Sequence, residues 1–338
     1  MNVTTLGIDL AKNVFQVHGV DGQGKVVLRK RLSRLELGGF IAKLSPCLIG
    51  MEACGSSHYW ARKFIAFGHQ VKLMSPQFVK PYVKSNKNDA NDSEAICEAV
   101  TRPNMRFVPI KQLEQQDMQS LHRIRSQLIA NRTALANQIR GLLAEYGIIF
   151  SKEIQNVRKK LPEIIGEENG ELSDFFRSLI AGLYNDFIAL DKRIASCDKK
   201  ITLLFNENEK CKRIAKIPGI GVIGATALIS AISDPRIFKN GRELSAWIGL
   251  VPRQSSSGNR QTLLGISKRG DKYLRCLLIH GARAVLYKTA GKTDSLSCWI
   301  TRLKERRGTN KACVALANKK SRVVWALLAK EEKYRHAA

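Results

Sequence analysis

The first 105 residues constrain the fold most, because short apolar runs alternate there with helical stretches. The strand-like runs, rich in Val, Ile and Leu, are VTTLGID, FQVHGV, KVVLRKR, CLIGME and QVKLM. Asp21-Gly22 is typical of a hairpin turn between the second and third runs. Three meandering strands followed by a strand, a helix and a strand form the order of an RNase H-like fold. We therefore predict an α/β domain of this kind over residues 1–108.

Four acidic residues stand where such a domain would gather them. Asp9 follows the first run, Glu52 ends the fourth, and Asp89 and Asp92 share one face of a predicted helix, KNDANDSEAICEAV. Carboxylates from separate elements repel each other unless a cation lies between them, and hard cations such as Mg²⁺ prefer carboxylate oxygens. The four residues therefore predict a Mg²⁺ site suited to phosphodiester chemistry. In the alternative interpretation each is an ordinary solvated acid, and Asp89 caps the helix.

The charge of the chain indicates a polyanionic partner. It carries 56 Lys and Arg against 29 Asp and Glu, a formal net charge of +27, and residues 253–338 hold 20 of these cations against 5 acids. Nucleic acid is favoured over a membrane, because neither a long amphipathic stripe nor a lipidation motif is present. The eight scattered cysteines favour reduced thiols over a disulfide framework or zinc site. We expect a soluble, intracellular protein.

The middle of the chain changes to a seven-residue period. Leucines recur at 121, 128, 135 and 142, and a second stretch carries two interleaved apolar rows. These rows are Phe176, Leu183, Leu190, Cys197 and Leu204, and Ile180, Phe187, Ile194 and Ile201. The alternation predicts an antiparallel coiled coil over residues 109–208. It serves either as a hairpin within one chain or as a dimerisation arm, and Gly166 and Asn169-Gly170 are expected in its loop.

The last part, residues 209–338, is predicted to be a mainly helical, basic domain. In AKIPGIGVIGATALISAI, Gly219 and Gly221 follow a proline and open a helix, so backbone N–H groups there can meet a phosphate. The turn is similar to that of helix-hairpin-helix DNA-binding modules. The alternative interpretation is a plain packing corner between two helices.

A serine run among cations follows this turn. Ser255, Ser256 and Ser257 precede Gly258 in a loop flanked by basic residues, and a helix from about Asp271 presents more. The basic residues are Arg253, Arg260, Lys268, Arg269, Lys272, Arg275 and Arg283. A serine hydroxyl in this setting could attack a phosphodiester while arginines neutralise the developing charge. Taken without a family resemblance, such a serine run is far more often a linker.

Six segments in order carry a resemblance to a known family. GIDLAK, MEACGS, NDANDSEA, IPGIG, IGLVPRQSSSG and ISKRGDKYLR resemble transposases of the one-ten family of insertion sequences, in its eleven-eleven subgroup. The resemblance implies a RuvC-like DEDD domain, a coiled coil and a C-terminal transposase domain with an essential serine. The Mg²⁺-binding tetrad would be Asp9, Glu52, Asp89 and Asp92. Ser93 departs from the pattern, which has alanine there.

The serine that this family uses lies immediately before a glycine. That position selects Ser257, although a shifted register would select Ser255 or Ser256. The resemblance further implies a covalent 5′-phosphodiester between serine and DNA, and a composite site in a homodimer or tetramer. It also implies a structured non-coding guide RNA, so that base pairing reads sequence. The protein would act in the bacterial cytoplasm, at the nucleoid.

Three other functions fit parts of the sequence. A RuvC-like junction endonuclease would hydrolyse with water and would need neither the serine nor the coiled coil. An actin-like ATPase or sugar kinase would need a second glycine-rich phosphate loop, for which ISKRGDKY is a poor match. A non-catalytic nucleic-acid-binding protein would leave the acidic tetrad unexplained. We therefore predict an enzyme, an RNA-guided DNA recombinase that excises and inserts its own element.

Overall fold

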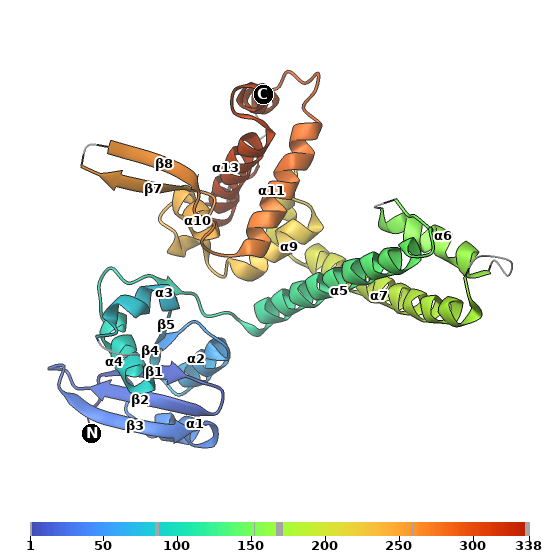
Figure 1. The fold of residues 1–338 in the computed structure, drawn as a ribbon. Coiled ribbons are helices and arrows are strands. Elements are labelled where there is room, and N and C mark those ends of the chain that lie inside the picture. Colours follow the sequence, from blue (N-terminus) through green and yellow to red (C-terminus); the bar gives the residue numbers. More distant parts are fainter. Residues whose placement is uncertain (1, 85–87, 152, 167–171, 259, 335–338) are drawn as a thin grey trace. The chain divides into compact units, whose positions relative to one another are not determined.

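The computed structural model describes residues 2–84, 88–151, 153–166, 172–258 and 260–334. The chain divides into two compact units, Met1–Gln112 (unit 1) and Leu113–Ala338 (unit 2), both drawn in Figure 1. Unit 1 holds a mixed sheet with helices, and unit 2 is mostly helical. The predicted combination of an N-terminal α/β part with a helical remainder is confirmed. The three predicted domain ranges stay a proposal.

Unit 1 is built on a six-stranded sheet of order β3-β2-β1-β4-β5-β6. Its first three strands form an antiparallel meander, β4 and β5 extend it in parallel, and β6 pairs antiparallel with β5. The strands are β1 (Thr5–Leu10), β2 (Val14–Val20), β3 (Val26–Ser33), β4 (Leu48–Glu52), β5 (Gln70–Met74) and β6 (Phe107–Val108). The apolar runs predict β1 to β5. The two-residue β6 is too short to leave a pattern.

Helices pack on both faces of this sheet. They are α1 (Arg34–Ala42), α2 (Ser57–Ala66), α3 (Pro76–Val79), the 3-10 turn η1 (Lys80–Tyr82) and α4 (Asp89–Val100). Phe15, Trp60 and Phe64 belong to the buried core beneath α1 and α2. Helix α4 lies so close to β1 that a Cβ atom on Gly7 would come 2.2 Å from the Ser93 carbonyl oxygen. This contact fixes the start of α4 beside the end of β1.

Unit 2 contains the remaining elements. The helices are α5 (Leu113–Ala144), α6 (Ile154–Gly166), α7 (Asp174–Glu207), α8 (Glu209–Ala215), α9 (Val222–Ala231), the 3-10 turn η2 (Pro235–Ile237), α10 (Gly241–Ile248), α11 (Lys272–Tyr287), α12 (Ser295–Arg307) and α13 (Thr309–Ala329). Two strands, β7 (Pro252–Ser257) and β8 (Arg260–Ile266), form a separate hairpin. Within the described ranges, no helix is both long and apolar enough to cross a lipid bilayer.

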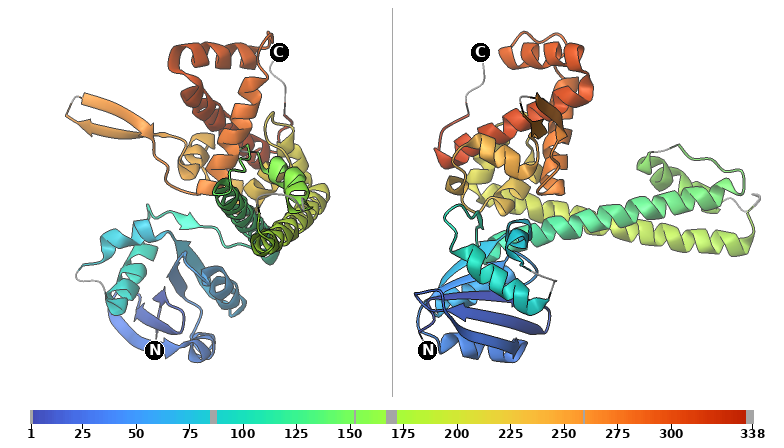
Figure 2. Two further views of the ribbon diagram at one scale, coloured as in Figure 1. Left: turned by 45° about the vertical axis from the view of Figure 1, so that its right-hand side comes forward. Right: turned by 60° about the vertical axis from the view of Figure 1, so that its left-hand side comes forward.

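The long helices α5 and α7 run side by side in opposite directions, as Figures 1 and 2 show. Ion pairs join Arg132 to Asp191 and Arg125 to Asp198. Residue numbers therefore increase along α5 in the direction in which they decrease along α7, so the two helices are antiparallel. Leu128 is buried in this pairing, but Leu142 is 37% exposed. A straight helix drifts about 20° per seven residues, so a strict leucine row leaves the interface after a few turns. A coiled-coil seam and a dimerisation role remain predictions.

The connection between α5 and α7 differs from the predicted loop. Helix α6 occupies residues 154–166, with Pro162 inside it and Gly166 as its last residue. Its Val157 and Leu161 are buried against the ends of α5 and α7. Tertiary packing therefore sustains a helix that the proline argues against. Asn169-Gly170, also expected in the loop, lies outside the described residues.

Helices α8 to α13 enclose the largest apolar core of the chain. Ile214, Leu228, Leu244, Leu278 and Leu316 are buried within it. The hairpin of β7 and β8 extends from α10, where Gly249 ends the helix with a φ of +83°. Residues 252–258 of the hairpin are all exposed. The segment predicted as a loop is thus a two-stranded ribbon, visible in Figure 2.

Candidate functional site

Three of the four predicted acidic residues converge in unit 1. The carboxylate oxygens of Asp9, Asp89 and Asp92 all lie within 4.8 Å of one another. Asp9 stands near the end of β1, whereas Asp89 and Asp92 occupy the first turn of α4. The side chain of Asn88 caps this helix by accepting a hydrogen bond from the Asn91 amide at 2.8 Å. Asp89 is therefore not the cap, and its carboxylate is left for the cluster.

Glu52 lies beside this cluster. In the parallel pair of β1 and β4, Ile8 is opposite Met51, so Asp9 and Glu52 come next in adjacent strands. Burial, and then the charges of Glu52 and Asp9, raise the pKa of the Cys54 thiol above its ordinary value. Both carboxylates thus act on the same side chain. Within the described residues, however, Glu52 is not one of the three acids that meet within 4.8 Å.

The donor set fits a hard divalent cation. Carboxylate oxygens are the ligands that Mg²⁺, Mn²⁺ and Ca²⁺ prefer, and the group contains neither a thiol nor an imidazole. Asp9 and Asp92 are half-buried and Asp89 is exposed, so the cluster is open on one side. Three like charges this close require a neutralising partner. The arrangement can hold a cation and present it to a substrate from the exposed side.

The three serines lie on the β7–β8 hairpin in unit 2. Ser255 is opposite Thr262, Ser256 opposite Gln261, and Ser257 opposite Arg260. Because side chains alternate along a strand, Ser255 and Ser257 share one face and Ser256 points to the other. The Ser256 hydroxyl accepts a hydrogen bond from the Gln254 amide at 2.8 Å. All three serines are exposed, next to a turn in which Gly258 has a φ of +55°.

Most of the predicted basic residues surround this hairpin as exposed side chains. Arg253 lies on β7, Lys268 and Arg269 follow β8, and Lys272 is the first residue of α11. The side chain of Arg260 lies outside the described part of the structure. Exposed cations around a strand ribbon are suited to contact phosphates.

Arg275 corrects one expectation, because α11 does not present it to solvent. It is 9% exposed, and its guanidinium donates to the carbonyl oxygens of Ile248 at 3.0 Å and Arg269 at 3.4 Å. The side chain therefore joins α10, the 269 loop and α11. The Arg275 guanidinium therefore stabilises the segments that flank the β7–β8 hairpin and is not available to bind a nucleic acid.

The IPGIG turn opens α9 as predicted, with Gly221 as the residue before the helix. Gly219 and Gly221 are both exposed, and Gly219 has a φ of +80°. Beside the turn lies Lys320, which is 3% exposed and whose Nζ has no hydrogen-bond partner among the described residues. Burial lowers the pKa of Lys320 to about 8.

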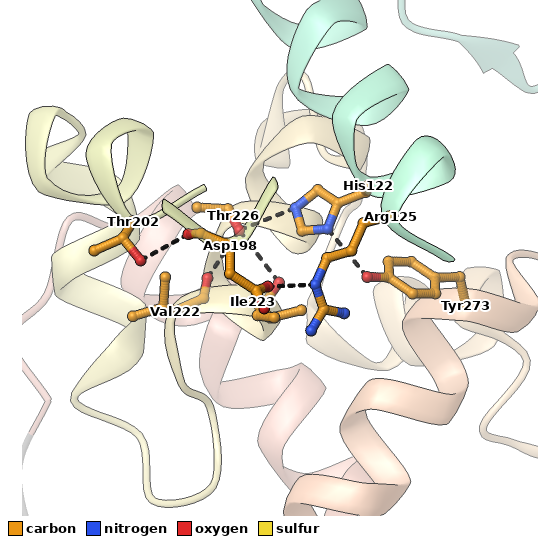
Figure 3. Close-up of polar contacts among 8 residues, drawn as sticks. All are labelled: His122, Arg125, Asp198, Thr202, Val222, Ile223, Thr226 and Tyr273. Carbon is orange, nitrogen blue, oxygen red and sulfur yellow. Dashed lines mark hydrogen bonds and ion pairs between the residues drawn. The ribbon is translucent and has the colours of Figure 1, made fainter. Parts of the chain in front are cut away.

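A buried polar network in unit 2 was not anticipated from the sequence. Figure 3 shows His122 of α5 between Thr226 of α9 and Tyr273 of α11, with both hydrogen bonds 3.0 Å long. The Thr226 hydroxyl donates to the Val222 carbonyl at 2.8 Å and so accepts from Nε2–H of His122. Nδ1 then accepts from the Tyr273 hydroxyl. Burial lowers the pKa of His122 to about 4, so the ring is neutral near pH 7.

Two parts of the chain match known protein families. Residues 211–296 match the family described as "Transposase IS116/IS110/IS902 family", and residues 6–148 match the family DEDD_Tnp_IS110, described as "Transposase". The second match contains the acidic cluster of unit 1. The first contains the serine hairpin and the IPGIG turn.

Similar proteins match over nearly the whole chain. The chain is 49% identical over 336 residues to the "Probable family 20 transposase" of Pseudomonas aeruginosa, covering 99% of each protein. It is 46% identical over 337 residues to the "Transposase for insertion sequence element IS1111A" of Coxiella burnetii, covering 100% of this chain and 93% of the relative. The more distant "Pilin gene-inverting protein" of Moraxella bovis is 24% identical over 335 residues, which cover 93% of this chain and 92% of that relative.

Proposed function

Because the chain belongs to the IS116/IS110/IS902 family of transposases, we propose that it excises and inserts its own insertion sequence with a carboxylate-held Mg²⁺ site and a serine nucleophile. Transposases of this family catalyse DNA cleavage and strand transfer, so the chain is a DNA-acting enzyme. The observation that carries the proposal is the convergence of Asp9, Asp89 and Asp92 within 4.8 Å.

The acidic residues form the first half of the mechanism. Asp9, Asp89 and Asp92, with Glu52 beside them, would hold the cation. A bound Mg²⁺ supplies positive charge that stabilises the phosphodiester oxygens during displacement. The carboxylates themselves fix where that charge sits, because β1 and the first turn of α4 are packed together at Gly7. Asp89 is the exposed member of the cluster, so the proposed DNA substrate would approach from its side.

Ser257 is the proposed nucleophile in the second half. Its Oγ attacks the scissile phosphorus, so an Oγ–P bond forms and the bond from phosphorus to the 3′-oxygen breaks. The hydroxyl proton leaves the serine, and the departing 3′-oxygen takes up a proton to become a 3′-hydroxyl. The downstream DNA stays attached to the protein through its 5′-phosphate. A 3′-hydroxyl of another strand reverses the step, which rejoins DNA and frees the serine.

Exposed basic side chains near Ser257 would stabilise the negative charge that develops during the attack. The attack places negative charge on the phosphate oxygens, and Arg253, Lys268 and Arg269 are exposed around the hairpin. The backbone of Gly219 and Gly221 is proposed to contact a more distant phosphate. Lys272 extends the same basic surface, and Arg260 is proposed to belong to it.

We extend the proposal to partners on the resemblance alone. The carboxylates of one copy and the serine of another form a composite site in a dimer or tetramer. A structured RNA encoded by the element pairs with donor and target DNA. The abundance of Lys and Arg supports a protein that binds the phosphate backbones of DNA and RNA, while base pairing by the RNA recognises the sequence.

Trapping the covalent intermediate tests the serine step. Purified protein would be mixed with the element RNA, Mg²⁺ and a duplex carrying abutted element ends, then quenched in detergent. A label downstream of the break should migrate with the protein, whereas an upstream label should be released. The adduct should disappear in Ser257→Ala and persist in Ser256→Ala, which alters the opposite face of β7. Cleavage to a free 5′-phosphate without any adduct would instead support the water-using junction endonuclease.

A further inference from the structure

Asp9 belongs to a row of side chains that crosses the sheet of unit 1. Asp9 is paired with Gln16 of β2, and Gln16 is paired with Arg31 of β3. Residues directly opposite in antiparallel strands point to the same face. Asp9 points to the α4 face, because its carboxylate meets those of Asp89 and Asp92. Gln16 and Arg31 therefore lie on the same face as the acidic cluster.

The neighbouring row confirms which face this is. The next row across the same three strands consists of Gly7, His18 and Arg29. Arg29 of this row forms an ion pair with Glu94 of α4 at 3.3 Å. Helix α4 covers that row at Gly7. The helix begins at Asp89, beside Asp9, so its axis does not continue beyond the row of Asp9.

Arg31 is exposed and Gln16 is half-buried. Within the described residues Arg31 forms no ion pair, unlike Arg29. Arg31 thus lies on the same face as the carboxylate cluster, and its charge does not neutralise an acidic side chain among the described residues. It is available for a negatively charged ligand that also approaches the cluster.

The spacing suits a DNA strand. Adjacent strands lie about 4.8 Å apart, so the backbone of Arg31 is roughly 10 Å from that of Asp9 across the sheet. Stacked nucleotides rise about 3.4 Å each along the helix axis, and their phosphates lie farther apart than that because the backbone winds around the axis, so this distance spans at most about three nucleotides. A strand whose scissile phosphate lies at the carboxylates would carry a neighbouring phosphate over β2 and β3.

We propose that Gln16 and Arg31 form a subsite that binds a DNA backbone phosphate within about three nucleotides of the cleaved bond. The subsite rests on the proposed function, because it takes the acidic cluster as the point of cleavage. Arg31 supplies the charge, and the Gln16 amide between it and Asp9 supplies a neutral hydrogen-bond donor. Together they set the direction of the substrate strand, across the meander and away from β4.

The same strand offers a matched control. Lys30 is also exposed and one residue away, but its side chain points to the opposite face, where its Nζ lies 4.9 Å from the centre of the Phe40 ring. Arg31→Gln and Lys30→Gln each remove one positive charge from β3. A general electrostatic effect would be the same in both variants, whereas a subsite would distinguish them.

The test measures binding of full-length protein, with the element RNA present, to a duplex of one element end, with Ca²⁺ in place of Mg²⁺, over a range of salt concentrations. Each phosphate contact contributes about 0.9 to the slope of log K against log salt. Arg31→Gln should lower this slope by about that amount, and Lys30→Gln should leave it unchanged. Arg31→Lys should keep the wild-type slope, which separates lost charge from misfolding. Equal slopes for Arg31→Gln and Lys30→Gln would overturn the subsite.

Single methylphosphonate substitutions locate the phosphate. One neutralised position within about three nucleotides of the cleavage site should weaken wild-type binding, and Arg31→Gln should be insensitive to that position alone. Sensitivity that persists unchanged in Arg31→Gln would also overturn the proposal. Neither readout requires cleavage. A failure of the proposed serine or metal chemistry therefore appears in the adduct assay and leaves these binding results readable.

Discussion

Gly219 of the IPGIG turn and Gly281 of α11 contact each other backbone to backbone. A Cβ atom on Gly219 would lie 2.2 Å from the Gly281 carbonyl oxygen, and one on Gly281 would lie 1.9 Å from the Gly219 carbonyl oxygen. Neither position can accept a side chain without separating the two segments. One glycine of the turn is thus required by packing, whatever the turn binds.

Gly219→Ala should destabilise unit 2 strongly. The new methyl group meets backbone, and the φ of +80° disfavours alanine, so we expect a loss of about 2–4 kcal/mol. Gly221→Ala is the control: nothing lies within 4 Å of its Cβ position and its φ is −93°. Denaturant unfolding should show Gly221→Ala within about 1 kcal/mol of wild type, since alanine replaces glycine at the N-cap of α9. Equal stability of the two variants would contradict the contact.

Removal of a cluster carboxylate should abolish metal-dependent stabilisation. Wild-type protein should gain about 2.7 kcal/mol at a Mg²⁺ or Mn²⁺ concentration 100 times its dissociation constant. Asp92→Asn should show little of this gain, because a ligand is lost while the side-chain shape is kept. Glu98→Gln on the same helix is the control, since Lys84 and Arg102 hold that carboxylate away from the cluster. Thermal shift with and without metal measures both.

Arg275 and Lys272 should separate into structural and binding roles. Arg275→Met removes two buried hydrogen bonds from a charged donor, so we expect a loss of about 1.5–3 kcal/mol in the free energy of unfolding. Lys272→Gln alters an exposed side chain and should leave stability unchanged while lowering the salt slope of DNA binding by about 0.9. The reverse pattern would place Arg275 back on the binding surface.

The neutral His122 should make the stability of unit 2 depend on pH. Its folded pKa is about 4, below the ordinary 6.5, so only the unfolded chain takes up the proton between these values. Stability should fall by up to about 3 kcal/mol as pH drops from 6.5 to 4. Denaturant unfolding of His122→Gln, which cannot titrate, should lack this part of the fall. An identical pH profile in both proteins would show that His122 is not held neutral.

The sequence predicted the elements whose patterns are local. The apolar runs located β1 to β5, and the i, i+3 spacing placed Asp89 and Asp92 together. The sequence does not predict the β7–β8 hairpin, because its strand residues are exposed on both faces and show no alternation of apolar and polar side chains. Such a ribbon is defined by its pairing, which a single run of residues does not reveal.

Other features depended on distant contacts. Arg275 follows the buried Leu274 and stands three residues before the buried Leu278, so the spacing of α11 already placed it on the core side. The positive charge of Arg275 favours a surface position, but the spacing of α11 and the two carbonyl acceptors outweigh it. The row from Asp9 through Gln16 to Arg31 requires the register of three strands. Sequence alone gives the strands but not which residues are opposite one another.

Detection of the excised circle tests the central claim most directly. Cells carrying the native element would express wild-type, Asp9→Ala or Ser257→Ala protein, and PCR would amplify across abutted element ends. We predict a circular junction with wild type and none with either variant, at equal protein levels. Junctions that persist in Ser257→Ala would contradict the serine step, and junctions that persist in Asp9→Ala would contradict the role of the acidic cluster. Absence of junctions with wild type, in cells that make the protein and its flanking RNA, would contradict excision itself.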